Sequence, residues 1–209
     1  MYLQKHQRVL MWAVRSMVVA ILTVVAGAVV TGGAQDATVQ EAPGYEYRVL
    51  ATAKTSTMEK ELNDGAEAGF RFQAVMGGDT AGGSEVVVVM ARRADVKAQV
   101  AYKLLATSKT STMETELRAA ADAGFEYRGQ TVFKSAFGGQ EVVCILERDA
   151  SAPRLRSAYR LVATTKTSTL QKELQTAGAA GYALMGMTVG KTAMGGTELV
   201  AIMRRAEQP

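Results

Sequence analysis

The chain has 209 residues, with 24 basic and 20 acidic side chains and one histidine, His6. Lys5, Arg8 and Arg15 lie in the first 15 residues, where there is no acid, so removing them leaves 21 basic residues against 20 acidic ones. Because the remaining chain is close to neutral, it lacks the basic surplus that nucleic-acid binding requires, and we expect no nucleic-acid partner.

Residues 1–34 have the layout of a secretory signal peptide. Basic residues precede an apolar segment at 17–30, and small residues up to Ala34 provide a cleavage site. The apolar segment is shorter than the roughly 20 residues that a membrane-spanning helix needs. An uncleaved membrane anchor is the alternative, and the chain would contact a membrane only through this segment. We expect a periplasmic or secreted protein, with a short exposed leader at 35–44.

The rest of the chain is one module of about 50 residues that occurs three times. The repeats cover residues 45–93, 100–149 and 157–206. One such unit is too small to bury a comfortable core alone, and the linkers between units are short. We therefore predict an α+β protein in which three tandem β-α-β-β repeats pack into one body with pseudo-threefold character.

Each repeat opens with a predicted strand, rich in β-branched residues, that contains a shared tyrosine. The three tyrosines are Tyr47, Tyr102 and Tyr159. A helix follows, and its start matches a capping box, because a serine stands three residues before a glutamate or glutamine. In this motif the serine oxygen accepts a backbone N–H of the first turn. The capping residues are Ser56, Ser111 and Ser168.

Apolar residues four positions apart, such as Met58 and Leu62, give each helix one apolar stripe. A glycine then ends the helix, because glycine adopts the left-handed backbone conformation at little cost. These glycines are Gly69, Gly124 and Gly181.

The second predicted strand has a small residue at its middle, which indicates a bulge or close packing against the helix. These residues are Ala74, Gly129 and Gly186. A Gly-Gly pair then reverses the chain into a third strand that is apolar on both faces, for example at residues 142–146. A strand of this kind needs cover on both faces, so we place it between the other two strands of its sheet.

Few side chains of this sequence are suited to catalysis or metal binding. Because His6 lies in the predicted signal peptide, the exported chain has no histidine, which excludes histidine-dependent serine or cysteine catalysis and imidazole metal sites. Cys144 lies in the apolar third strand, and we interpret it as a buried apolar side chain rather than a nucleophile. We expect no catalytic residue, no cofactor and no metal. The arginines that end the third strands are expected in solvent: Arg92, Arg148 and Arg205.

The sequence Lys-Thr-Ser-Thr occurs once in each repeat, at the start of the predicted helix, and we call it the Lys-Thr-Ser-Thr box. It is the one feature whose residue types suggest a ligand-binding site. A lysine and hydroxyl groups at a helix N-terminus can bind an anion, because free N–H groups and the helix dipole favour negative charge there. Capping and turn geometry is the alternative explanation, and it accounts for the serine but not for the lysine. The candidate ligand-binding residues are Lys54, Thr55, Ser56, Thr57, Lys109, Thr110, Ser111, Thr112, Lys166, Thr167, Ser168 and Thr169.

Reduced to these features, the repeat resembles the small bacterial family known as domain of unknown function 4177. The residues that carry the resemblance best are Tyr47, Leu62, Asn63, Gly69, Phe70 and Arg92. The likeness covers about 150 residues in three copies. Family members commonly have tryptophan after the glycine, where this chain has Phe70, Phe125 and Tyr182. The resemblance implies a compact α+β unit and brings no catalytic residues, since the family has no established activity.

We therefore expect an exported, non-catalytic binding or structural module that contacts an unknown protein. Three near-identical units would suit multivalent contact with a repeating partner, because linkage multiplies weak affinities. The rival hypothesis is a small-anion or anionic-ligand binding protein that uses the Lys-Thr-Ser-Thr helix N-termini.

Overall fold

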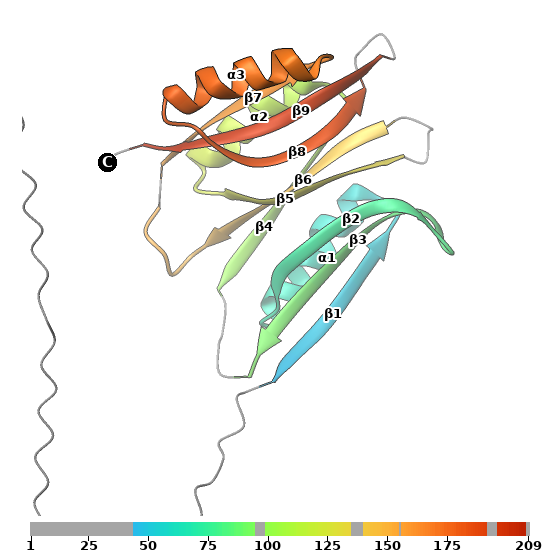
Figure 1. Cartoon of the computed structure of the whole chain (residues 1–209). Coiled ribbons are helices and arrows are strands. Elements are labelled where there is room, and N and C mark those ends of the chain that lie inside the picture. The colour runs from blue at the N-terminus through green and yellow to red at the C-terminus, as the bar shows by residue number, and fades with distance from the viewer. Residues whose placement is uncertain (1–43, 95–98, 135–139, 155, 192–195, 208–209) are drawn as a thin grey trace, which may run out of the picture. The chain divides into compact units, whose positions relative to one another are not determined.

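The computed structural model describes residues 44–94, 99–134, 140–154, 156–191 and 196–207. The predicted signal peptide at 1–34, and the leader apart from Gly44, lie outside the described residues. Three copies of the order strand, helix, strand, strand follow one another (Figure 1). Each three-stranded sheet packs with one helix, so the prediction of an α+β fold built from repeats is confirmed. Within these ranges no helix is both long enough and apolar enough to span a membrane.

The repeats share their element order and their sheet topology. Repeat 1 contains β1 (Tyr45–Thr52), α1 (Thr55–Glu67), β2 (Arg71–Thr80) and β3 (Gly83–Arg93). Repeat 2 contains β4 (Val100–Thr107), α2 (Thr110–Asp122), β5 (Glu126–Lys134) and β6 (Gln140–Asp149). Repeat 3 contains β7 (Ser157–Thr164), α3 (Thr167–Ala179), β8 (Ala183–Lys191) and β9 (Thr197–Ala206). The antiparallel orders are β1-β3-β2, β4-β6-β5 and β7-β9-β8, so the third strand of each repeat is central, as predicted.

The central strands are apolar without alternation because both of their faces are covered. In β6, Cys144 and Leu146 join the core under α2, while Val143 and Ile145 join the core of repeat 1. All four side chains are buried. The interpretation of Cys144 as a buried apolar residue is confirmed, and burial raises the pKa of its thiol to about 12.

The helices begin earlier than a capping box requires. Their N-cap residues are Lys54, Lys109 and Lys166, and no side chain caps any of the three helices. The predicted capping by Ser56, Ser111 and Ser168 is therefore wrong, because each serine lies inside the first helical turn. A threonine at the end of the preceding strand makes the local contact instead. The Lys54 N–H donates to Oγ1 of Thr52 at 3.1 Å, and Thr107 and Thr164 accept in the same way.

The helices end at glycine, as predicted. Gly69, Gly124 and Gly181 have φ angles of 85°, 83° and 84°, in the left-handed region. In repeat 1 the Phe70 N–H donates to the Gly65 carbonyl at 2.9 Å, which closes the last helical turn.

The arginine at the end of each third strand is not simply solvated. The Arg92 guanidinium lies 4.7 Å from the centre of the Phe70 ring and donates to the Ala68 carbonyl at 2.9 Å. The same stacking pairs Arg148 with Phe125 and Arg205 with Tyr182. Arg205 is exposed and Arg92 and Arg148 are half-buried, so these arginines do reach solvent, but each is also held in place because the ring and the helix C-terminus both attract the cation.

The second strands carry the predicted bulge, but the close packing is with a neighbouring repeat. The β5 register shifts between Tyr127 and Gly129, and β2 and β8 shift at the equivalent place. A Cβ atom on Gly129 would lie 2.9 Å from Cζ of Phe72, which belongs to repeat 1. Glycine is needed here because an aromatic ring of the preceding repeat occupies the space.

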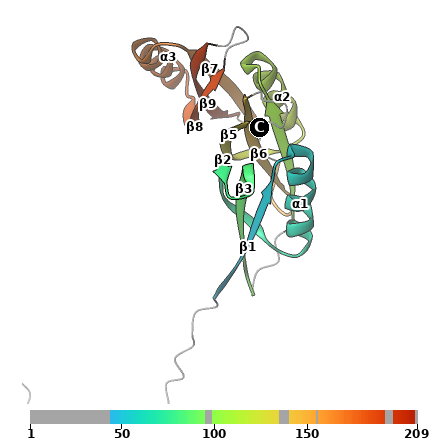
Figure 2. The same ribbon diagram turned by 90° about the vertical axis from the view of Figure 1, so that its right-hand side faces the viewer.

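Neighbouring repeats meet through the same two contacts at both junctions. The helix of one repeat packs on the first strand of the next, α1 on β4 and α2 on β7. The second strands also contact each other in succession, β2 with β5 and β5 with β8 (Figure 2). Repeat 2 therefore packs against both of the other repeats, and its residues Tyr102, Val143 and Ile145 complete the core of repeat 1.

Candidate binding surfaces

The Lys-Thr-Ser-Thr boxes lie at three separate helix starts. Each lysine is an N-cap, and the next three residues form the first turn. All twelve side chains are exposed or half-buried. Each box belongs to the helix of its own repeat, and no principal contact between the described elements joins two helices. The structure therefore places the candidate residues as three separate surface sites.

A hollow beside the first box contains negative as well as positive charge. Thr55 and Ser56 line it together with Glu59, Lys103 and Glu116. Glu59 reaches across the junction, where its carboxylate accepts the N–H of a β4 residue at 2.8 Å. An anion at this box would therefore lie near two carboxylates, which weakens its attraction.

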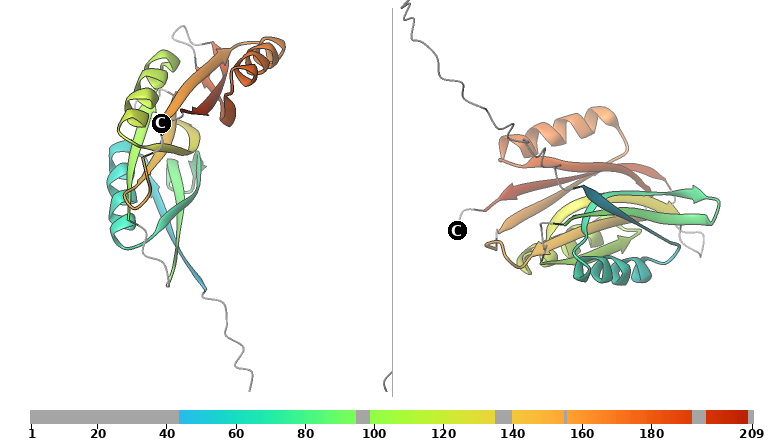
Figure 3. Two further views of the ribbon diagram at one scale, coloured as in Figure 1. Left: turned by 90° about the vertical axis from the view of Figure 1, so that its left-hand side faces the viewer. Right: turned by 90° about the horizontal axis from the view of Figure 1, so that it is seen from below.

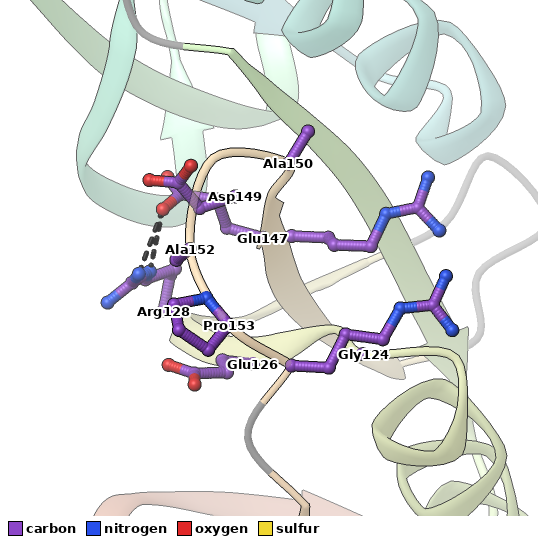
Figure 4. Close-up of a pocket in the computed structure, with 10 residues that line it drawn as sticks. Gly124, Glu126, Arg128, Glu147, Asp149, Ala150, Ala152 and Pro153 are labelled. Carbon is purple, nitrogen blue, oxygen red and sulfur yellow. Dashed lines mark hydrogen bonds and ion pairs between the residues drawn. The ribbon is translucent and has the colours of Figure 1, made fainter.

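A buried glutamate forms the polar centre of the junction between repeats 1 and 2. Glu147 lies on β6 and is only 1% exposed. Its Oε1 accepts hydrogen bonds from Arg71 of β2 at 2.6 Å and from Arg128 of β5 at 3.1 Å. Its Oε2 accepts the Tyr102 hydroxyl at 2.8 Å. Figure 4 shows Arg128 bonded to this carboxylate in a hollow that Asp149 and Pro153 also line.

The contacts around Glu147 give it a structural role at the junction between repeats 1 and 2. Burial raises the pKa of Tyr102, so its phenol stays protonated and can donate to the carboxylate. The same hydroxyl accepts the Phe72 N–H of repeat 1 at 2.7 Å. Because donors of the chain itself engage both carboxylate oxygens, this group holds two repeats together.

Sequence reasoning missed Glu147 because it is not shared between repeats. The equivalent residues are Ala91 in β3 and Arg204 in β9. A search for residues common to the three units passes over such a position. The available signal was the opposite one, an acidic residue that only repeat 2 carries at this position, directly after its apolar run.

Among the described residues, the clearest uncovered surface is the outward face of β1. Tyr47 is 64% exposed, whereas the equivalent Tyr102 and Tyr159 are 3% and 1% exposed. Tyr45 and Val49 project from the same side of the strand and are also exposed. We call Tyr45, Tyr47 and Val49 the front face. Seen from below, β1 and its sheet face the viewer (Figure 3, right).

Comparison of the chain with models of protein families, with curated proteins and with solved structures found no match. The resemblance to domain of unknown function 4177 therefore stays a prediction, and function must be inferred from the surfaces described above.

Proposed function

We propose that this chain is an exported, non-catalytic binding or structural module that acts through its front face. Its location would be periplasmic or secreted, as the composition of residues 1–34 indicates. Glu147, the most deeply buried charged group of the described residues, has both carboxylate oxygens bonded within the chain, which favours a structural role over acid–base chemistry.

The observation that carries this proposal is the exposure of Tyr47. In repeats 2 and 3 the equivalent tyrosine is covered by a preceding repeat, and its hydroxyl takes part in a hydrogen bond there. The same kind of surface is left open in repeat 1. Aromatic and β-branched residues clustered on one exposed face are typical of a protein interface.

Photo-crosslinking in the cells that make the protein tests this proposal. Position 47 receives a photoreactive phenylalanine derivative, and the matched control carries it in place of Lys172, an exposed residue of α3. We expect crosslinked species from position 47 and few from position 172. If the two positions give equal yields, the front face is not a binding surface.

The second candidate function is binding of a small anion at the helix N-termini. It is favoured by the absence of side-chain caps at the three helices, which leaves first-turn N–H groups to water or a ligand. Sulfate or phosphate should then raise the melting temperature above that in chloride of equal ionic strength. Combined replacement of Lys54, Lys109 and Lys166 by alanine should abolish the rise. An unchanged melting temperature and no heat of binding would eliminate this function.

A further inference from the structure

The two ends of the described repeats are open in complementary ways. Within the described residues, no other repeat covers the front face of repeat 1 or the helix and second strand of repeat 3 (Figure 1). We call the residues at the second end the back face: Gln171 and Gln175 of α3 with Leu184, Met187 and Val189 of β8. The exposed large apolar side chains of the described ranges all lie on these two faces, apart from Met76 of β2, which projects from the same side of its sheet as the front face.

A tyrosine hydroxyl marks each internal junction. The Tyr127 N–H of repeat 2 donates to the hydroxyl of Tyr159 in repeat 3 at 2.8 Å, as the Phe72 N–H does to Tyr102 at the first junction. The equivalent donor at the open end is the N–H of Leu184, whose side chain is 49% exposed. The equivalent acceptor is the hydroxyl of Tyr47.

A helix side chain binds the free edge of the next first strand. Asn63 of α1 accepts the Tyr102 N–H at 2.9 Å and donates to the Tyr102 carbonyl at 3.0 Å. The equivalent residue in α3 is Gln175, whose amide can also donate and accept. The equivalent strand residue is Tyr47, so the open ends carry both halves of this contact.

The internal junctions each carry a matched ion pair, with the charges reversed between them. At the first junction Arg71 lies 2.6 Å from Glu147. At the second, the residues in the equivalent positions are Glu126 and Arg204, 3.5 Å apart. Each junction therefore avoids burying an unpaired charge, although the sign at each position differs.

The open ends carry alanine at both positions of this pair. Ala183 stands where Arg71 and Glu126 stand in the earlier repeats, and Ala91 stands where Glu147 and Arg204 stand. A contact between the two ends would thus bury no charge. The back face would not fit against repeat 2 or repeat 3, because Glu147 or Arg204 would then lie beside Ala183 without a counterion.

The two open ends are also matched in the sizes of the side chains that would pack against each other. At the internal junctions an aromatic side chain lies against glycine, as Phe72 does against Gly129. At the open ends the equivalent residues are Leu184 and Ala74. In a contact between the two ends, leucine would take the place of the larger aromatic side chain, and alanine would take the place of glycine. The two differences offset each other in volume.

We propose that copies of this chain associate head to tail, with the front face of one copy seated on the back face of the next. The contact repeats the one that joins consecutive repeats inside the chain. It rests on the proposed function, because it names the partner of the front face. Such a heterologous contact generates a ring if successive rotations close, and a filament otherwise.

The test uses the protein as isolated from the cells that make it. Sedimentation across a concentration series should show the mass rising above that of one chain. Tyr47→Asp blocks the front face and Leu184→Asp blocks the back face, and each variant alone should stay monomeric. Mixed together, the two should form dimers and nothing larger, because only one productive pair of faces remains. Ala119→Asp, at an exposed residue of α2 in the middle repeat and outside both faces, should associate like the unaltered chain.

Two results would overturn the head-to-tail contact. One is an unaltered chain that stays monomeric at every concentration. The other is self-association of Leu184→Asp copies, which would mean that two front faces meet each other. If the chain is monomeric and the crosslinks from position 47 contain a different protein, the front face still binds a partner and only the self-association is lost. If position 47 gives no crosslinks, the proposed function is lost as well.

Discussion

Glu147 shows how one residue can join two repeats. Its side chain is buried, while the side chains of its partners Arg71 and Arg128 are 41% and 36% exposed. Buried carboxylates persist only when donors compensate for their lost hydration. Here two guanidinium groups and the Tyr102 hydroxyl provide that compensation from three different strands.

Replacing Glu147 by glutamine should therefore loosen the first junction. We expect the free energy of unfolding to fall by about 1–3 kcal/mol, less than for a fully buried pair because the arginines can turn to water. Equilibrium unfolding in urea measures this change. The matched control is Glu126→Gln at the charge-reversed junction, where the pair is longer and more exposed. That substitution should cost no more than about 1 kcal/mol. Equal losses would contradict the role assigned to Glu147.

At the scale of elements, each helix is positioned by the strand before it and by the strand that ends its repeat. A threonine hydroxyl at the end of the first strand accepts the N–H of the N-cap lysine. At the other end of the helix, the glycine reverses the chain and an arginine of the third strand stacks on the next aromatic ring. These contacts explain why the threonine at the end of the first strand, the glycine with the aromatic residue after it, and the terminal arginine recur together in the three repeats.

Substitutions at the helix starts test whether the threonine before the helix, and not the serine inside it, stabilises the first turn. Thr107→Val keeps the shape of the side chain but removes the oxygen that accepts the Lys109 N–H at 3.1 Å. We expect it to lower the free energy of unfolding by about 1 kcal/mol. Ser111→Ala should change it by less than about 0.5 kcal/mol, because this serine lies in the first turn and caps nothing. Urea unfolding of both variants measures the difference, and a larger loss for Ser111→Ala would restore the capping box.

At the scale of the whole molecule, each repeat is incomplete without a neighbour. Repeat 1 takes Tyr102 and Ile145 from repeat 2 into its core, and repeat 2 takes Tyr159 and Ile202 from repeat 3. Within the described residues no further repeat adds to the core of repeat 3, and its buried cluster is correspondingly small. Stacked repeats usually need terminal units with polar outer surfaces. Here the outer surfaces of repeats 1 and 3 both carry exposed apolar side chains, which supports the proposed self-association.

Much of the repeat architecture was predictable because it depends on local residues. The strand–helix–strand–strand order follows from periodicity, the helix ends from glycine, and the central third strand from its apolar run. The start of each helix was mispredicted because a serine-based capping box and a threonine-based turn overlap within a few residues. The candidate box residues were correctly placed at helix starts, but sequence could not show that two carboxylates share the hollow beside Thr55.

The sequence by itself determined that the chain is a threefold repeat of one α+β unit, since short-range patterns encode each element. Only the tertiary structure decided which of the equivalent residues are buried and which are exposed. Tyr47, Tyr102 and Tyr159 look alike in sequence, yet only the last two are buried. Burial depends on which repeat packs alongside, and that contact joins residues that are far apart in the chain.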